Sequence, residues 1–295
     1  MGLSWQQGPL SGSANGHFLT PEPLPDRLLF AERLRRRMRV RFGDAWVADS
    51  ENALLLHEPG HYPVAYFPRE DVDERALTAS GKVTQHKDLG DTAWYAVHAG
   101  GRTTERAAWE LAAPPGFAAD FRGRIAFAWR AMDGFYEEDE RIVGHASDAY
   151  HRIDIRNTSR TLEVRDGDTV IARTEHPVVL YESGFAPRWY VPTADIDHSR
   201  LQPVEGQTFC PYKGLCDYYD VGDARRAAWT YRDAYREVDR IGGMVSFEPD
   251  EIEVRLDGER LHLETGQQVT PHGVDRSLDA AEATPHLANP NRARL

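Results

Sequence analysis

The chain has 295 residues, of which 41% are hydrophobic and 28% charged, and its formal net charge is −12. This composition is that of a soluble globular protein long enough for two domains with cores of their own. The negative charge argues against a broad nucleic-acid or anionic-membrane surface, because both need clustered lysine and arginine. The basic run at residues 33–41 is short and leads into a strand pattern, so we interpret it as a solvated face.

The sequence carries no signal for a membrane or for secretion. No apolar run is long enough to cross a bilayer, and the N-terminal residues lack the charged start and apolar centre of a secretion signal. Cys210 and Cys216 are the only cysteines, too few for a disulfide framework. We therefore expect a cytoplasmic protein with neither a nucleic-acid nor a membrane partner; its oligomeric state stays open.

The first third of the chain begins with a leader and then turns to strands. Residues 1–27 are rich in Gly, Ser and Pro and are predicted to be flexible. Leu28–Arg37 is predicted to form a short helix capped by Asp26. Val40–Phe42 and Ala45–Ala48 are predicted to pair as a hairpin around Gly43-Asp44.

A further strand is predicted at Ala53–His57, from its nearly continuous apolar run. Pro63 and Pro68 then flank Tyr66-Phe67, a pattern that suits an edge strand or an extended loop.

The sequence then repeats itself. At a shift of 124 positions, residues 40–73 and 164–197 agree at 14 of 34 positions, where chance would supply roughly two. After a four-residue difference the match resumes at residues 107–109 and 227–229. We therefore predict two homologous domains, at 28–148 and 149–265, followed by a disordered tail at 266–295.

The second copy supplies three further expectations. Gly144–Arg152 is a polar connector ahead of it, and Ala224–Val238 has apolar residues spaced as on one helical face. Alternating apolar residues on both sides of Asp257-Gly258 predict a hairpin. Many short strands with Gly-Asp and Asp-Gly turns make the predicted class mainly β, with short helices.

The segment Cys210-Pro-Tyr-Lys-Gly214 has two interpretations. Lys213 can serve as a handle for an anion or a carbonyl, with Gly214 letting the backbone approach the ligand and aromatic walls around it. Alternatively, the segment is a tight turn with its tyrosines packed inward and Lys213 in water. The first copy has Leu89 at the position of Lys213, so the second copy is the better candidate for a working site.

Metal and thiol chemistry are not predicted. The cysteines are too far apart for the usual zinc pairing, and buried inert thiols are the expected state. Glu58 and Glu182 recur beside an apolar strand and are interpreted as paired structural carboxylates, with an arginine such as Arg188 as partner.

The repeated pattern includes Glu182, the Pro187–Pro192 run, the Thr208–Gly214 run, Ala227-Ala228-Trp229 and the closing Val254–Gly258. As a set, these motifs resemble the bacterial family known as domain of unknown function 427. The resemblance implies two compact, mainly β units of coiled antiparallel sheets, each with a tent-like cleft. Some descriptions of the family carry the label nucleotidyltransferase-like, and none supplies an established reaction or cofactor.

These observations lead to one hypothesis and two alternatives. The hypothesis is a tandem β-domain protein that binds a small ligand in the cleft of the second copy. An anionic ligand is one option. The alternatives are a nucleotidyltransferase-like enzyme that uses the same loop and a non-catalytic interaction or structural module, so whether the chain is an enzyme stays open. The residues expected to contact the ligand are Lys213, Tyr212, Cys210, Tyr219, Trp229, Arg188 and Glu182.

Overall fold

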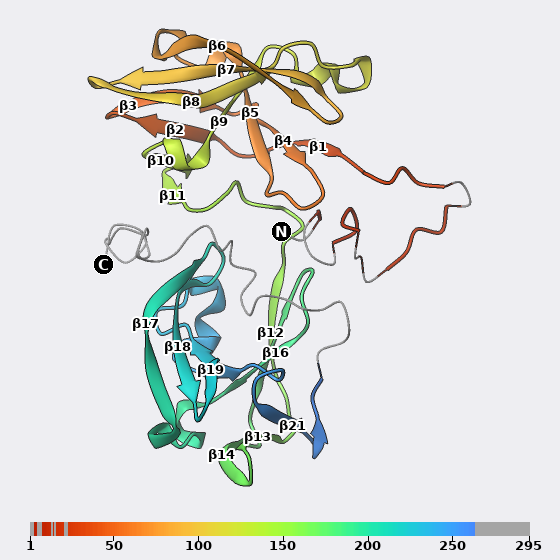
Figure 1. Cartoon of the computed structure of the whole chain (residues 1–295), viewed down its shortest axis with the longest axis vertical. Helices are drawn as coiled ribbons and strands as arrows, with labels where there is room; N and C mark the ends of the chain where they lie inside the picture. Colours follow the sequence, from red (N-terminus) through yellow and green to blue (C-terminus); the bar gives the residue numbers. More distant parts are fainter. Residues whose placement is uncertain (1–2, 5–7, 13, 15, 21–22, 263–295) are drawn as a thin grey trace. The chain divides into compact units, whose positions relative to one another are not determined.

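The computed structural model describes residues 3–4, 8–12, 14, 16–20 and 23–262. The chain divides into two compact units (Figure 1), which we call the first and the second repeat. The first repeat is Phe18–Asp148, and the second is the chain from Ala149 together with the described residues before Phe18. The predicted tail at 266–295 lies outside the described residues, as does part of the predicted leader.

Both repeats are built from antiparallel sheets, so the mainly β prediction is confirmed. The part of the chain that the structure describes contains short 3-10 helices and no α-helix. Each repeat has one seven-stranded and one four-stranded sheet.

The first repeat places its strands in the following order. Its large sheet runs β1 (Phe30–Arg33), β4 (Leu54–His57), β5 (Val64–Pro68), β9 (Arg124–Phe127), β8 (Arg102–Leu111), β7 (Gly90–Ala99) and β6 (Leu77–His86). Its small sheet runs β11 (Glu140–Ile142), β10 (Gly134–Glu137), β2 (Met38–Phe42) and β3 (Ala45–Ser50).

The second repeat has the same order of equivalent strands. Its large sheet runs β12 (Ile153–Asn157), β15 (Val178–Glu182), β16 (Arg188–Val191), β20 (Val245–Phe247), β19 (Ala224–Thr230), β18 (Gly214–Val221) and β17 (Leu201–Cys210). Its small sheet, given in the same direction as that of the first repeat, runs β22 (Glu259–Arg260), β21 (Glu253–Leu256), β13 (Leu162–Asp166) and β14 (Thr169–Thr174). Even the bulges recur: Arg106 and Arg226, at equivalent positions, both have φ of 50°. The repeat in the sequence is therefore a repeat in the fold.

Short 3-10 helices cover the strand connections. They are η1 (Arg69–Asp71), η2 (Glu74–Ala76), η3 (Gly116–Phe121), η4 (Trp129–Ala131), η5 (Thr193–Asp195), η6 (His198–Arg200) and η7 (Arg236–Ile241). None of the helices in the described residues is long and apolar enough to cross a membrane.

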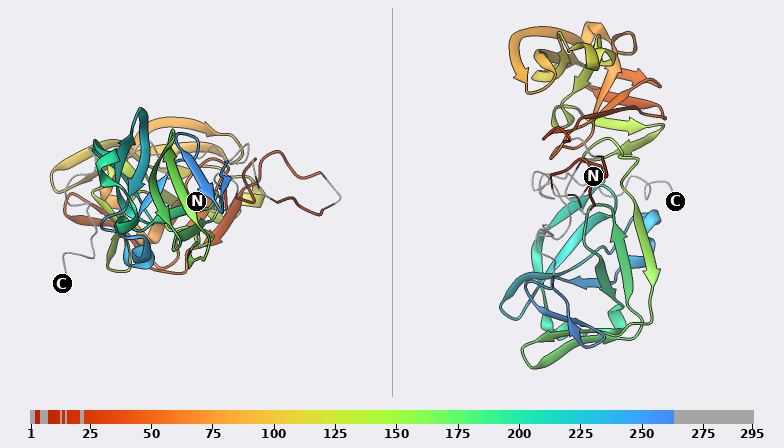
Figure 2. Two further views of the ribbon diagram at one scale, coloured as in Figure 1. Left: turned by 90° about the horizontal axis from the view of Figure 1, so that it is seen from below. Right: turned by 90° about the vertical axis from the view of Figure 1, so that its right-hand side faces the viewer.

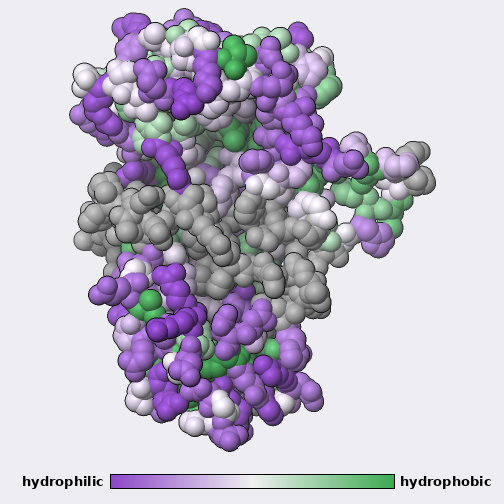
Figure 3. Space-filling model, in the orientation of Figure 1, coloured by the Kyte–Doolittle hydropathy of each residue, from purple (hydrophilic) through white to green (hydrophobic). Residues whose placement is uncertain are grey.

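Each repeat has a core on either side of its large sheet. Along β2 the side chains of Met38, Val40 and Phe42 point inward and pack between the two sheets of the first repeat, as the period of two along a strand requires. The second repeat has the equivalent core around Val164. Its other core lies on the opposite face of the large sheet and contains Trp229. In Figures 1 and 2 the long strands β17, β18 and β19 form one curved layer, and Figure 3 shows mainly hydrophilic side chains on the visible face of both repeats.

Both predicted tight hairpins are confirmed. Gly43 and Asp44 have φ of 54° and 64°, and Asp257 and Gly258 have φ of 53° and 85°. Two successive residues with positive φ are typical of the type I′ turn that matches the twist of paired strands. The predicted connector at Gly144–Arg152 lies between β11 and β12.

Three predictions about elements are wrong. Leu28–Arg37 contains strand β1, which pairs with β4, rather than a helix. Ala224–Val238 begins with strand β19, which is hydrogen-bonded on both sides, by β18 and β20. The segment with Pro68 is the internal strand β5, between β4 and β9; Pro68 is its last residue.

Candidate functional site

The segment expected to hold the site is the turn between β17 and β18. Cys210 pairs with Gly214 across the hairpin, and the Lys213 N–H donates to the Cys210 carbonyl at 3.3 Å. Gly214 has φ of 98°, and a Cβ at this position would lie 3.2 Å from the Asp233 carbonyl oxygen. The glycine is therefore required by the packing of the chain itself.

Lys213 is buried, with 3% of its surface exposed. Its Nζ lies 2.5 Å from Oε2 of Glu182, at the end of β15. The other carboxylate oxygen of Glu182 lies 3.0 Å from Nε2 of His151, whose ring stacks on Tyr212 with 3.7 Å between centroids. The interpretation that left Lys213 in water is wrong, because Glu182 compensates its charge inside the protein.

The burial of this cluster changes its proton affinities. Burial alone would raise the pKa of the Glu182 carboxyl, but the Lys213 ammonium and the His151 hydrogen bond outweigh it and lower that pKa to about 2. Burial would lower the pKa of Lys213, but the acidic groups around it, Cys210 and Glu182 first, keep it above its ordinary value. Burial also lowers the pKa of His151, despite its contact with Glu182. At neutral pH the cluster therefore holds one carboxylate, one ammonium and a neutral imidazole.

Aromatic rings and thiols surround the ion pair. Nε1 of Trp229 donates to the Tyr190 hydroxyl at 3.4 Å, and Nζ of Lys213 lies 5.9 Å from the centre of the Tyr231 ring. Cys210 and Cys216 are buried and unbridged, and burial raises both pKa values, that of Cys216 to about 12. Both thiols are therefore protonated at neutral pH, in keeping with the inert state expected of them.

Arg188 lies further along the same face and has a different partner from the one expected. Its Nη1 lies 3.2 Å from Oε1 of Glu248, and its guanidinium carbon lies 5.5 Å from the centre of the Trp229 ring. The suggested pairing of Arg188 with Glu182 is wrong, because Glu182 is taken by Lys213 and His151.

The structure brings most of the expected ligand residues to one face of the large sheet. Tyr212, Cys210, Trp229 and Lys213 pack in or against the core on that face, next to Glu182. Tyr219 does not join them, because its ring packs against the core on the opposite face. Its hydroxyl accepts a hydrogen bond from Arg232 Nη2 at 3.2 Å.

The first repeat keeps the carboxylate and changes its partners. Oε1 of Glu58, equivalent to Glu182, lies 2.5 Å from Nη2 of Arg27 and 3.0 Å from Nε2 of His86. Arg27 stands where the second repeat has His151, and buried Leu89 stands where it has Lys213. The two repeats thus compensate the charge of the equivalent carboxylate with different residues.

Glu58, His86 and Asp88 place potential metal-ligand atoms within 4.8 Å of one another. Arg27 already binds both carboxylates, at 2.5 Å and 2.7 Å. Nδ1 of His86 accepts hydrogen bonds from two backbone N–H groups, at 3.1 Å each. In the neutral ring Nε2 then carries the proton and has no lone pair for a metal. We therefore assign no metal to this cluster.

Sequence reasoning missed three residues of the second repeat. His151 stands in the connector and reaches Glu182 because β12 pairs with β15. Ser246 lies in β20 and, in the described residues, has a buried Oγ without a hydrogen-bond partner, while Glu248, the partner of Arg188, comes directly after β20. Their equivalents in the first repeat are Ala126 and Ala128. An alignment of the two copies could have found Ser246 and Glu248, because each is a polar residue where the first copy has an alanine.

The comparison with protein families agrees with this architecture. The family profile NTP_transf_9, described as a domain of unknown function (DUF427), matches residues 30–138 and 154–258. No curated protein matches the chain. The two matches cover most of the chain and coincide with the two repeats of the fold, so the chain belongs to the DUF427 family and carries two copies of its domain.

Proposed function

We propose that the chain binds a small ligand with an anionic group at the second repeat, through Lys213. The observation that supports this most is the buried lysine itself. Burying charged groups costs several kcal/mol per ion before pairing repays it. The first repeat builds the same strands and the same turn with Leu89 at this position. The fold therefore does not require a buried lysine there.

The chemistry of the cluster suits an acceptor oxygen of a ligand. An ammonium group has three donors, and among the described residues Glu182 is the one acceptor to which Nζ of Lys213 donates. The ring of Tyr212 is only partly buried on the turn, so a ligand would approach Lys213 past this ring. Trp229 and Tyr231 would form the apolar walls.

The proposal stops at binding. Nucleotidyl transfer would need a pair of carboxylates to hold a metal near the lysine. In the described residues Glu182 is the one carboxylate that bonds Lys213, and it is also engaged by His151. We also propose a cytoplasmic location, where the two unbridged thiols, Cys210 and Cys216, would stay reduced.

A thermal-shift screen tests the proposal. Nucleotides, sugar phosphates and small carboxylates are offered to the wild type and to Lys213→Leu combined with Glu182→Gln. The double variant gives position 213 the residue of the first repeat and leaves no unpaired charge. A ligand at 100 times its Kd stabilises the wild type by about 2.7 kcal/mol, and this stabilisation should disappear in the double variant.

The control is Arg27→Leu combined with Glu58→Gln, which removes the ion pair made by Glu58, the first-repeat equivalent of Glu182. This control should keep the full ligand response. A panel that stabilises no form of the protein, or a response that survives in the Lys213 variant, would count against the proposal and favour a non-catalytic interaction module.

A further inference from the structure

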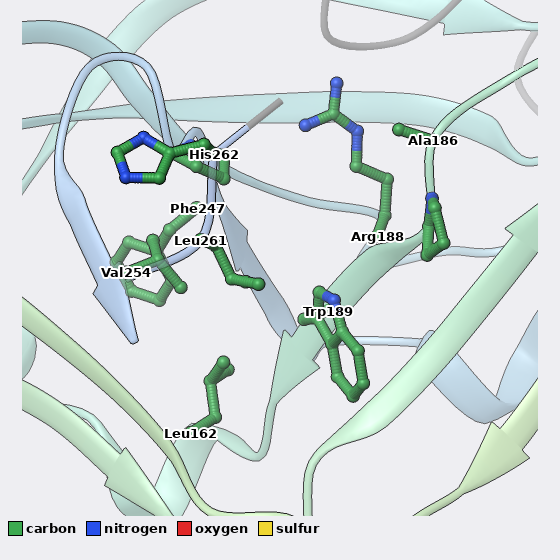
Figure 4. Close-up of a pocket in the computed structure, with 10 residues that line it drawn as sticks. Leu162, Ala186, Arg188, Trp189, Phe247, Val254, Leu261 and His262 are labelled. Atoms are coloured by element: carbon green, nitrogen blue, oxygen red, sulfur yellow. The ribbon is translucent and has the colours of Figure 1, made fainter. Parts of the chain in front are cut away.

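A pocket of about 240 Å³ lies in the second repeat at the ends of β16 and β20, and no residue of the Lys213 turn lines it. Figure 4 shows Ala186 and Arg188 on one side of this pocket and Phe247, Val254 and His262 on the other. Trp189, Leu261 and two prolines add further apolar surface. A dry cavity of about 150 Å³ holds a benzene ring, so this pocket has room for one ring with a substituent.

Polar atoms without partners lie beside the apolar wall. In the described residues Nη2 of Arg188 and Oε2 of Glu248 are buried without a hydrogen-bond partner, although Nη1 and Oε1 of the same two residues are 3.2 Å apart. Arg188 lines the pocket, as do Phe247 and Pro249, the two neighbours of Glu248. Each unpaired buried polar group costs roughly 1–3 kcal/mol. The pair thus offers one unused donor next to one unused acceptor.

The first repeat shows that the fold does not need this pair. Its equivalent positions hold Val64 and Ala128, in the same strand order and the same register beside Tyr66 and Tyr190. Replacing a buried ion pair by apolar residues is often neutral or stabilising. The second repeat keeps an arrangement that costs stability, and a bound ligand that satisfies both atoms would offset this cost.

We propose that this pocket binds a small planar molecule whose edge carries a carbonyl beside an N–H, such as an aromatic primary amide or a lactam. The carbonyl accepts from Nη2 of Arg188, the N–H donates to Oε2 of Glu248, and the ring contacts Trp189 and Phe247. A carboxylate fits less well because Glu248 would repel it, and a cation fits less well because Arg188 would. Both polar atoms are shielded from water without a ligand, so binding includes a small shift of the two side chains toward the pocket.

Three probes of similar shape test the hydrogen-bonding edge. Benzamide has the donor and the acceptor, benzoate lacks the donor and is charged, and N,N-dimethylbenzamide lacks the donor. Titration calorimetry should show benzamide binding at least ten-fold more tightly than the other two, because a site left with unpaired polar groups rejects an analogue strongly. Equal affinities for the three probes, or no binding of benzamide, would overturn the proposal.

Variants locate the binding. Arg188→Val combined with Glu248→Ala introduces the residues of the first repeat, and it should weaken benzamide binding at least ten-fold without unfolding the protein. The indole N–H signal of Trp189, assigned with Trp189→Phe, should shift on titration in the wild type. The Lys213→Leu, Glu182→Gln variant should bind benzamide normally, since neither residue lines the pocket. Loss of benzamide binding in that variant alone would contradict a separate site.

Discussion

Glu58 and Glu182 occupy the same position in the two repeats, and both are ion-paired in the interior or at its margin. The partners differ, however: an arginine and a histidine in one repeat, a lysine and a histidine in the other. The side chain of Glu182 is 8% exposed. Its ionised form is therefore held by Lys213 and His151 more than by water.

The pKa of Glu182 predicts how the second repeat responds to acid. Because the folded-state pKa is about 2, below the unfolded value, the carboxylate contributes stability above pH 4.5 that is lost as pH falls toward 2. The contribution is about 3 kcal/mol at neutral pH. His151, whose folded-state pKa is also lowered, acts in the same direction below its ordinary pKa.

Urea unfolding at a series of pH values measures this effect. The difference in unfolding free energy between wild type and Glu182→Gln should shrink by about 3 kcal/mol between pH 7 and pH 2. Glu58→Gln serves as the positional control in the first repeat. A difference that stays constant with pH would show that the charge of Glu182 does not carry the stability.

At this scale the repeated motif directed attention to particular residues but did not show which residues they contact. Lys213 and Glu182 could be named because they stand in the repeated motif. The contact between them joins residues 31 positions apart, and it depends on strand pairing that no local pattern reports. The partner of Arg188 could not be found for the same reason, since Glu248 comes 60 positions later.

At the scale of elements, the hairpins were predictable and the helices were not. A Gly-Asp or Asp-Gly dipeptide specifies a turn through its own backbone, so the local sequence suffices. β19 has buried residues at four successive positions, 227–230, and this pattern also fits one side of a helix over a longer window. Hydrogen bonds to β18 and β20 make this segment a strand rather than a helix, and the positions of those two strands depend on the fold as a whole.

The turn at Gly43 yields a prediction with a control in the other repeat. Gly43 and its equivalent Gly167 have φ of 54° and 58°. A Cβ on Gly43 would lie 2.1 Å from the Ala99 carbonyl oxygen, whereas one on Gly167 would meet nothing within 4 Å. Gly167→Ala should cost roughly 1–2 kcal/mol from its backbone angle. Gly43→Ala should cost about 1–3 kcal/mol more because of the overlap.

Chemical denaturation of the two alanine variants gives this comparison directly. The atoms that a Cβ on Gly43 would meet belong to the backbone, which cannot rotate away as a side chain can, so the overlap is relieved only by moving the chain itself. Equal destabilisation by the two substitutions would mean that the turn at Gly43 does not lie against the β7–β8 turn at Ala99 and Gly100 as closely as the structure has it.

At the scale of the molecule, the duplication was predictable because it is written in the sequence at a fixed shift. The chain length allowed two domains with cores of their own, and the structure shows which residues build each core. The cores of the first repeat, around Phe42 and Tyr66, use only its residues, and those of the second, around Val164 and Trp229, use only residues of that repeat. A domain with a core of its own can unfold on its own.

Scanning calorimetry should therefore resolve two transitions that respond to different substitutions. Gly43→Ala acts on a turn of the first repeat and should lower only one melting temperature, while Glu182→Gln, in the second, should lower only the other. For domains between 100 and 150 residues long, a loss of 1 kcal/mol lowers the melting temperature by roughly 4 °C. If both substitutions move a single transition equally, the repeats unfold as one cooperative unit. In that event a ligand bound at the second repeat would stabilise the first as well, and the two copies would be linked through stability.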